Sequence, residues 1–217
     1  MKKLFYLCLA AIVLGVSLTG FTDQALATVS IKNQLISQKV RASVSTWGAG
    51  GNTSIYTIEP GKTEKWKRSD PDGVLVVNHS ANKTYFMSSF ESVVAEYGSD
   101  DTQVFQTTYG QLLYPINTDV PSGTNGKIKV KNNSNATIQV AVNKWGSGNG
   151  TYFTLNPGNS ESWSRNDERG YIMAIKNKNN YRKYYYIKPG KDIEINSLGE
   201  PTIDGVRIQQ IFMPGKM

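Results

Sequence analysis

The sequence has one cysteine and one histidine, and this scarcity excludes most common catalytic and metal-binding chemistry. A zinc site built from Cys and His needs three or four such ligands, so that class of site is excluded. A Cys–His dyad is excluded because the cysteine, Cys8, lies in an apolar stretch at the N-terminus. A Ser–His–Asp triad would depend wholly on His79, which lies in the turn-like stretch NHSAN. We expect no enzyme, and no metal or other cofactor.

Carboxylate chemistry is the one catalytic alternative left by this composition. Paired carboxylates can hydrolyse glycosidic bonds, and an oxygen-rich DPDG turn (70–73) could bind calcium. The candidate carboxylates occur in duplicate, as Glu64 with Glu161 and Asp70 with Asp167. A duplicated binding site is more common than a duplicated active site, so these residues favour binding over catalysis.

No apolar run is long enough to read as a retained membrane span. The N-terminus has two lysines, then an apolar run from Leu4 to Leu18, then Ala25-Leu26-Ala27. A spanning helix needs about 20 apolar residues. This layout is typical of a cleaved secretory signal peptide over residues 1–27, and predicts a secreted, extracellular protein. Cleavage would remove Cys8, so the mature chain would have no disulfide, and would lower the formal charge from +7 to +6.

The rest of the chain contains an internal sequence duplication. EKWKRSDPDG (64–73) matches ESWSRNDERG (161–170), and the match extends upstream to WG at 47–48 and 145–146. Pro, Gly, Ser and Asn cluster in NTDVPSGTNG (117–126), which marks the boundary between the copies. The sequence therefore predicts two homologous domains, residues 28–120 and 121–217, each of about 90 residues.

Each copy has the pattern of short strands joined by tight turns. Apolar and polar residues alternate over 40–44 and 138–142, the period of a half-buried strand. Pro-Gly pairs at 60–61 and 157–158 predict turns. The one candidate helix, 89–97, fits an edge strand and loop equally well. We predict an all-β protein made of two tandem β-sandwich domains.

The duplicated aromatic and charged residues admit two interpretations. In the first they are architecture: Trp66 and Trp163 alternate with charged neighbours, which predicts that they face the cores. In the second they bind a ligand, because Trp, Tyr and Arg suit interfaces with headgroups or sugars. In NYRKYYYIK (180–188), Arg182, Tyr184 and Tyr186 would share one strand face. The candidate binding residues are Trp47, Arg68, Asp70, Tyr85, Trp145, Arg165, Asp167, Arg182, Tyr184 and Tyr186.

The order WG, I-x-P, R-S-D-x-x-G and an aromatic strand resembles the aegerolysin family. The matching positions are 47–48, 58–60, 68–73 and 85–86 in the first copy, and 145–146, 155–157, 165–170 and 184–185 in the second. The resemblance implies a β-sandwich that binds particular membrane lipids and acts with a larger protein partner. Unlike that family, this chain is a tandem duplication.

These observations lead to one leading hypothesis and two alternatives. The leading hypothesis is a secreted, non-enzymatic protein that binds membrane lipid headgroups, with cytolytic or toxin-like action as its strongest form. Two copies of a weak site would raise avidity about 10²–10⁴-fold if both can engage. The alternatives are a lectin-like module for glycans or cell wall, and a structural or inhibitory protein with a protein partner. Export and the absence of a dense basic run argue against nucleic acid.

Overall fold

The computed structural model describes residues 28–68, 72–99 and 101–212. The predicted signal peptide and Asp70 lie outside these ranges. Within them there is no α-helix, and so no helix that could cross a membrane. The strands are β1 Thr28–Asn33, β2 Val40–Val44, β3 Tyr56–Ile58, β4 Thr63–Lys67, β5 Val74–Asn78, β6 Lys83–Met87, β7 Ser92–Tyr97, β8 Gln103–Thr107, β9 Lys127–Asn132, β10 Ile138–Val142, β11 Phe153–Leu155, β12 Ser160–Ser164, β13 Tyr171–Lys176, β14 Arg182–Ile187, β15 Asp192–Ile195, β16 Pro201–Ile203, β17 Val206–Arg207 and β18 Gln210–Ile211.

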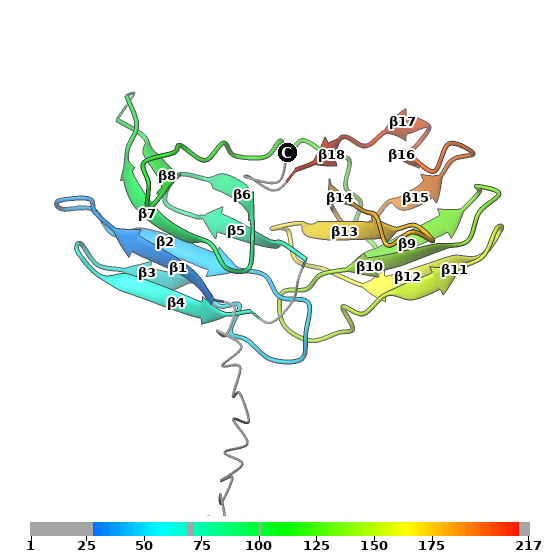
Figure 1. Ribbon diagram of the computed structural model, residues 1–217, viewed down its shortest axis with the longest axis horizontal. Coiled ribbons are helices and arrows are strands. Elements are labelled where there is room, and N and C mark those ends of the chain that lie inside the picture. Colours follow the sequence, from blue (N-terminus) through cyan, green and yellow to red (C-terminus); the bar gives the residue numbers. More distant parts are fainter. Residues whose placement is uncertain (1–27, 69–71, 100, 213–217) are drawn as a thin grey trace, which may run out of the picture.

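Each repeat is a pair of sheets, which confirms the predicted all-β fold of two sandwiches. The first repeat has an outer sheet of order β4-β1-β7-β8 and an inner sheet of order β3-β2-β5-β6. The second has an outer sheet of order β12-β9-β15-β16-β17 and an inner sheet of order β11-β10-β13-β14-β18. The ambiguous segment 89–97 contains β7, which lies between β1 and β8 and is therefore not an edge strand. Figure 1 shows the first repeat on the left and the second on the right.

The duplication extends to individual hydrogen bonds. Buried Asn33 and Asn132 end equivalent strands, and their side-chain amides donate to Ile58 O and Leu155 O, both at 2.9 Å. The predicted Pro-Gly turns are also equivalent. Gly61 and Gly158 have φ values of 74° and 82°, a region that favours glycine. The repeated residues thus determine the backbone path of each sandwich.

The core tryptophans lie where the structural interpretation placed them. Trp66 and Trp163 are buried, and each meets an aromatic ring of the inner sheet edge-on. Tyr56 lies 5.7 Å from Trp66 and Phe153 lies 5.8 Å from Trp163, centroid to centroid. Such pairs add about 0.5–1.5 kcal/mol to the burial of the rings.

The two repeats meet along a shared buried surface, which we call the inter-repeat interface. At its centre Thr46 and Lys144 exchange backbone hydrogen bonds of 3.0 and 2.8 Å, forming an antiparallel bridge. Five buried residues of the second repeat belong to the same hydrophobic cluster as the core of the first: Ala141, Ile172, Ala174, Tyr184 and Tyr186. Strand β5 is consequently buried along its whole length, one face toward its own outer sheet and one toward the second repeat.

Candidate functional site

Arg68 and Arg165, predicted as ligand-binding residues, are buried and act as architecture. Among the described residues, each guanidinium donates four hydrogen bonds to backbone carbonyl groups, at 2.6–2.9 Å for Arg68 and 2.6–3.0 Å for Arg165. The acceptors are equivalent in the two repeats: Val44, Ser45, Asn52 and Lys67 in the first, and Val142, Asn143, Asn149 and Ser164 in the second. Burial lowers the pKa of Arg165. These arginines connect the WG loop to the edge strand, so they do not form the ligand-binding site that the sequence predicted for them.

Trp47 and Trp145 also have structural partners. Their indole N–H groups donate to the equivalent carbonyls Gly73 O and Gly170 O, at 2.9 and 2.6 Å. Trp47 is buried, and Trp145 lies beneath the guanidinium of Arg169 at 3.9 Å from the ring centroid. Trp47 is therefore out of reach of a sugar, and one face of the half-buried Trp145 is covered by a guanidinium.

Tyr85 points into the core of the first sandwich. Its ring lies 4.9 Å from that of Phe105, and burial raises the pKa of its hydroxyl to about 12. The strand register pairs Val76 with Tyr85 and Met173 with Tyr185, so Tyr185 is the equivalent of Tyr85, one position after the residue suggested by sequence alignment. Tyr85 is therefore a core residue and not a binding residue.

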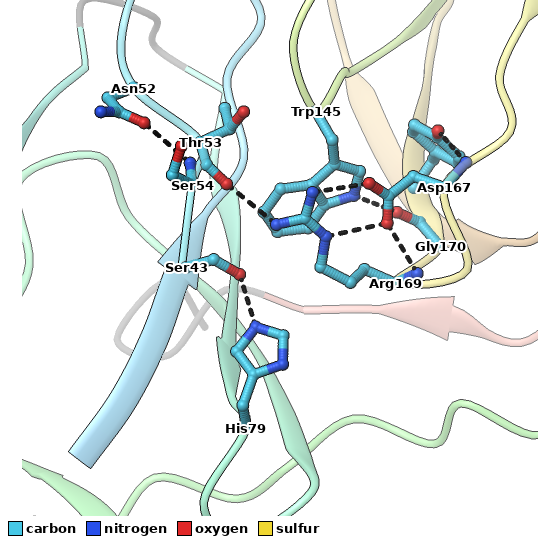
Figure 2. Close-up of polar contacts among 10 residues, drawn as sticks. Ser43, Asn52, Thr53, Ser54, His79, Trp145, Asp167, Arg169 and Gly170 are labelled. Carbon is cyan, nitrogen blue, oxygen red and sulfur yellow. Dashed lines mark hydrogen bonds and ion pairs between the residues drawn. The ribbon is translucent and has the colours of Figure 1, made fainter. Parts of the chain in front are cut away.

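Asp167 is paired within its own loop. Its carboxylate accepts bonds from Arg169 Nε at 2.8 Å and Nη2 at 2.6 Å. Burial alone would raise the pKa of Asp167, but these hydrogen bonds hold it below its usual range. Figure 2 shows Arg169 between Asp167 and the first repeat, where its Nη1 donates to Thr53 O at 2.9 Å. Asp167 thus holds Arg169 in a position where it donates a hydrogen bond to the first repeat.

His79 lies beside this contact and hydrogen-bonds a serine, as Figure 2 shows. Its Nε2 is 2.9 Å from Ser43 Oγ, the spacing of a nucleophile and its base. Ser43, however, has an exposed fraction of 0%, so no substrate can reach its hydroxyl. Burial lowers the pKa of His79, and the charges of Arg169 and Arg41 lower it further. Among the described residues, no group of three or more His, Cys, Asp or Glu could hold a metal ion.

No protein-family model matches this chain, and no curated protein matches it.

The face of β14 that was predicted to bind a ligand packs against the first repeat instead of facing solvent. Tyr184 and Tyr186 are buried; Tyr184 donates to Asp72 Oδ1 at 2.8 Å, and Tyr186 donates to Arg169 O at 3.2 Å. Arg182 Nε lies 3.4 Å from the same Asp72 oxygen. The sequence correctly grouped these three side chains on one face, but that face packs against the other repeat.

The accessible aromatic residues are a different set, and sequence analysis missed them. Phe90, Tyr109 and Tyr114 of the first repeat are 65%, 96% and 79% exposed. Phe90 lies in the β6–β7 turn, at the position that Gly190 occupies in the second repeat. An aromatic residue in a turn with no counterpart in the other copy was the available signal.

Exposed lysines lie on the outer sheet of the same repeat, on strands β1 and β4. Lys32 on β1 and Lys65 and Lys67 on β4 are exposed, and none of the ion pairs found among the described residues includes them. Ser30 of β1 pairs with Lys65 on one side and with Ser92 of β7 on the other. The β6–β7 turn therefore lies two strands from β4, about 10 Å away. We call Lys32, Lys65, Lys67, Phe90, Tyr109 and Tyr114 the aromatic–lysine face.

Alternation along the chain places Tyr114 on the same side as the lysines. Leu112 forms a bridge with Gln106 of β8, and Leu113 is buried. Leu112 and Tyr114 therefore point outward, away from the core. The equivalent outer sheet of the second repeat differs in part: its Lys129 pairs with Asp192 at 3.1 Å and its Arg207 pairs with Glu200 at 2.9 Å. Its Lys127 and Lys131 are exposed, and no ion pair found among the described residues includes them.

Proposed function

We propose that this is a secreted, non-enzymatic protein that binds lipid membrane surfaces through the aromatic–lysine face. The observation that carries the proposal is the exposure of Phe90, Tyr109 and Tyr114 on the repeat whose outer sheet presents three lysines that have no ion-pair partner among the described residues. The resemblance to aegerolysins favours the same class of ligand.

The two kinds of residue have complementary effects at a membrane. Aromatic rings partition into the headgroup region, where their apolar part leaves water. Each lysine near an anionic surface adds about 1 kcal/mol of attraction, and salt screens that attraction. Three lysines and three aromatic residues on one face would hold the protein reversibly at an anionic membrane.

The proposal places binding in one repeat. Both duplicated arginines and three of the four tryptophans are buried, and the half-buried Trp145 lies under Arg169, so these residues do not form two equivalent sites that could increase avidity. The second repeat supports the first through the inter-repeat interface.

Vesicle sedimentation of residues 28–217 tests the proposal. We expect binding to vesicles of phosphatidylcholine with phosphatidylserine, weaker binding to phosphatidylcholine alone, and loss of binding in Phe90→Ala/Tyr109→Ala. Lys65→Gln/Lys67→Gln should weaken binding to the anionic vesicles alone. Leu198→Ala, an exposed apolar residue of the second repeat, is the control and should bind normally.

Two outcomes would reject this assignment. Undiminished sedimentation of the Phe90→Ala/Tyr109→Ala variant would show that another surface binds lipid. Sedimentation with insoluble cell-wall polysaccharide but with no vesicle would favour the lectin-like alternative. If vesicles do bind, release of an entrapped dye will decide whether the protein also permeabilises them.

A further inference from the structure

Two pockets border strand β18, and the larger also borders the chain that links the two repeats. The larger has a volume of about 430 Å³ and the smaller about 300 Å³. Gln210, Ile211 and Phe212 border both. Phe212 is 65% exposed, so its side chain forms an accessible ridge between the pockets.

The larger pocket has mostly apolar walls. The chain that links the repeats supplies Ile116 and Val120, and the second repeat supplies Ile203, Ile208 and Ile211, with Tyr186 among the lining residues. The walls are held in place by backbone pairing, because Ile116 N donates to Thr84 O on β6 at 2.8 Å and β18 pairs with β14. A fixed apolar pocket of this volume at a domain boundary is typical of a small-ligand site.

The smaller pocket contains a positive charge. Arg182 lines it together with Tyr181 and Tyr184. The Asp72 carboxylate holds the guanidinium at 3.4 Å, but it also accepts hydrogen bonds from Tyr184 and Tyr152, at 2.8 and 3.1 Å. Arg182 Nε is buried on the Asp72 side, whereas the side chain as a whole is 35% exposed. Asp72 thus orients the cation and leaves part of its side chain accessible from the pocket.

We propose that the two pockets together bind one single-chain anionic amphiphile. The apolar chain lies in the larger pocket, crosses Phe212, and places its phosphate-like head at Arg182. Tyr186 in the larger pocket and Arg182 in the smaller are four residues apart on β14, a span of about 13 Å that an extended chain can cover. This site is separate from the aromatic–lysine face, and it would take a single molecule instead of a membrane surface.

Titration calorimetry with octyl phosphate below its micelle concentration tests the proposal. We expect saturable binding of one molecule per chain, no saturable binding of inorganic phosphate, and at least tenfold weaker binding of the neutral amphiphile octyl glucoside, because a charge-assisted hydrogen bond is lost. Arg182→Gln should reduce the affinity for octyl phosphate about tenfold and leave octyl glucoside binding unchanged. Phe212→Ala should weaken the binding of both.

Arg41→Gln is the matched control for charge. Arg41 on β2 is exposed and lines neither pocket, so its removal should leave octyl phosphate binding unchanged. Thermal unfolding checks that Arg182→Gln is folded. Because Phe212 is 65% exposed and belongs to neither buried cluster described, Phe212→Ala keeps the test decisive if Arg182→Gln is unstable.

The proposal fails if octyl phosphate gives no saturable heat, or if Phe212→Ala and Arg182→Gln both bind it as the native protein does. Equal affinity for inorganic phosphate would reduce the site to a simple anion site and also reject it. Membrane adsorption is tested separately: vesicle binding that depends on Phe90 and Tyr109 without octyl phosphate binding would refute this inference alone. The converse pattern would refute the proposed membrane function alone.

Discussion

The two repeats have the same residues where a side chain holds the backbone of its own sandwich, and residues of opposite charge where the repeats contact each other. Arg68 and Arg165 make equivalent sets of hydrogen bonds, yet the residue four positions later is Asp72 in the first repeat and Arg169 in the second. Asp72 receives two tyrosine hydroxyls and a guanidinium from the second repeat, whereas Arg169 pairs with Asp167 in its own loop and reaches Thr53 O. Residues that build each sandwich were retained in both copies, and residues at the interface became complementary.

Replacing either of the two equivalent arginines should give the largest change in the free energy of unfolding. Arg165→Met should destabilise the protein by about 3–5 kcal/mol, because buried carbonyl groups lose their donors. Arg68→Met should cost a similar amount, since its four acceptors are equivalent. Urea unfolding measures both. A cost below about 1 kcal/mol in either variant, or a large difference between the two, would contradict the equivalence.

The interface pair should give a smaller and unequal effect. Asp72→Asn should cost about 1–3 kcal/mol, because the buried carboxylate interacts with Arg182 and accepts two hydrogen bonds. Arg169→Gln should cost less, about 1 kcal/mol, since its ion pair with Asp167 lies nearer to solvent. The same urea series compares them, and a reversed order would show that Asp72 is not the central contact of the interface.

The smallest expected effect is a dependence of stability on pH through His79. Its pKa is lowered in the folded protein by burial, then by Arg169 and Arg41, with Asp167 opposing. Below about pH 6.5 the unfolded chain takes up a proton that the folded chain resists, so the free energy of unfolding falls as the pH falls toward the folded pKa. Above that pH the residue contributes no pH dependence.

Urea unfolding at pH values from 7.5 to about 5 measures this slope. The His79→Gln variant keeps a hydrogen-bonding side chain near Ser43 and should show a shallower decline. An identical slope in the two proteins would mean that the charges around His79 have no influence on stability.

The sequence predicted the fold because the signals for it are local. The strand alternation, the Pro-Gly turns and the repeated core tryptophans all act within one copy, and the structure places them as expected. The candidate site was different, because its exposure depends on how the copies pack. The alternation in β14 correctly put Arg182, Tyr184 and Tyr186 on one face, but nothing in that pattern shows that the first repeat covers it. Phe90 and Tyr109 were missed because they break the repeat instead of following it.

The antiparallel bridge between Thr46 and Lys144 has a further consequence. These residues occupy the same position in the two copies, and so do Ser45 and Asn143, whose side chains are joined by a 2.8 Å hydrogen bond. Contact between equivalent positions is the geometry of an isologous homodimer, here contained in one polypeptide. Covalent fusion makes the association independent of protein concentration. It also frees each half from matching the other, which is what allows an aspartate on one side and an arginine on the other.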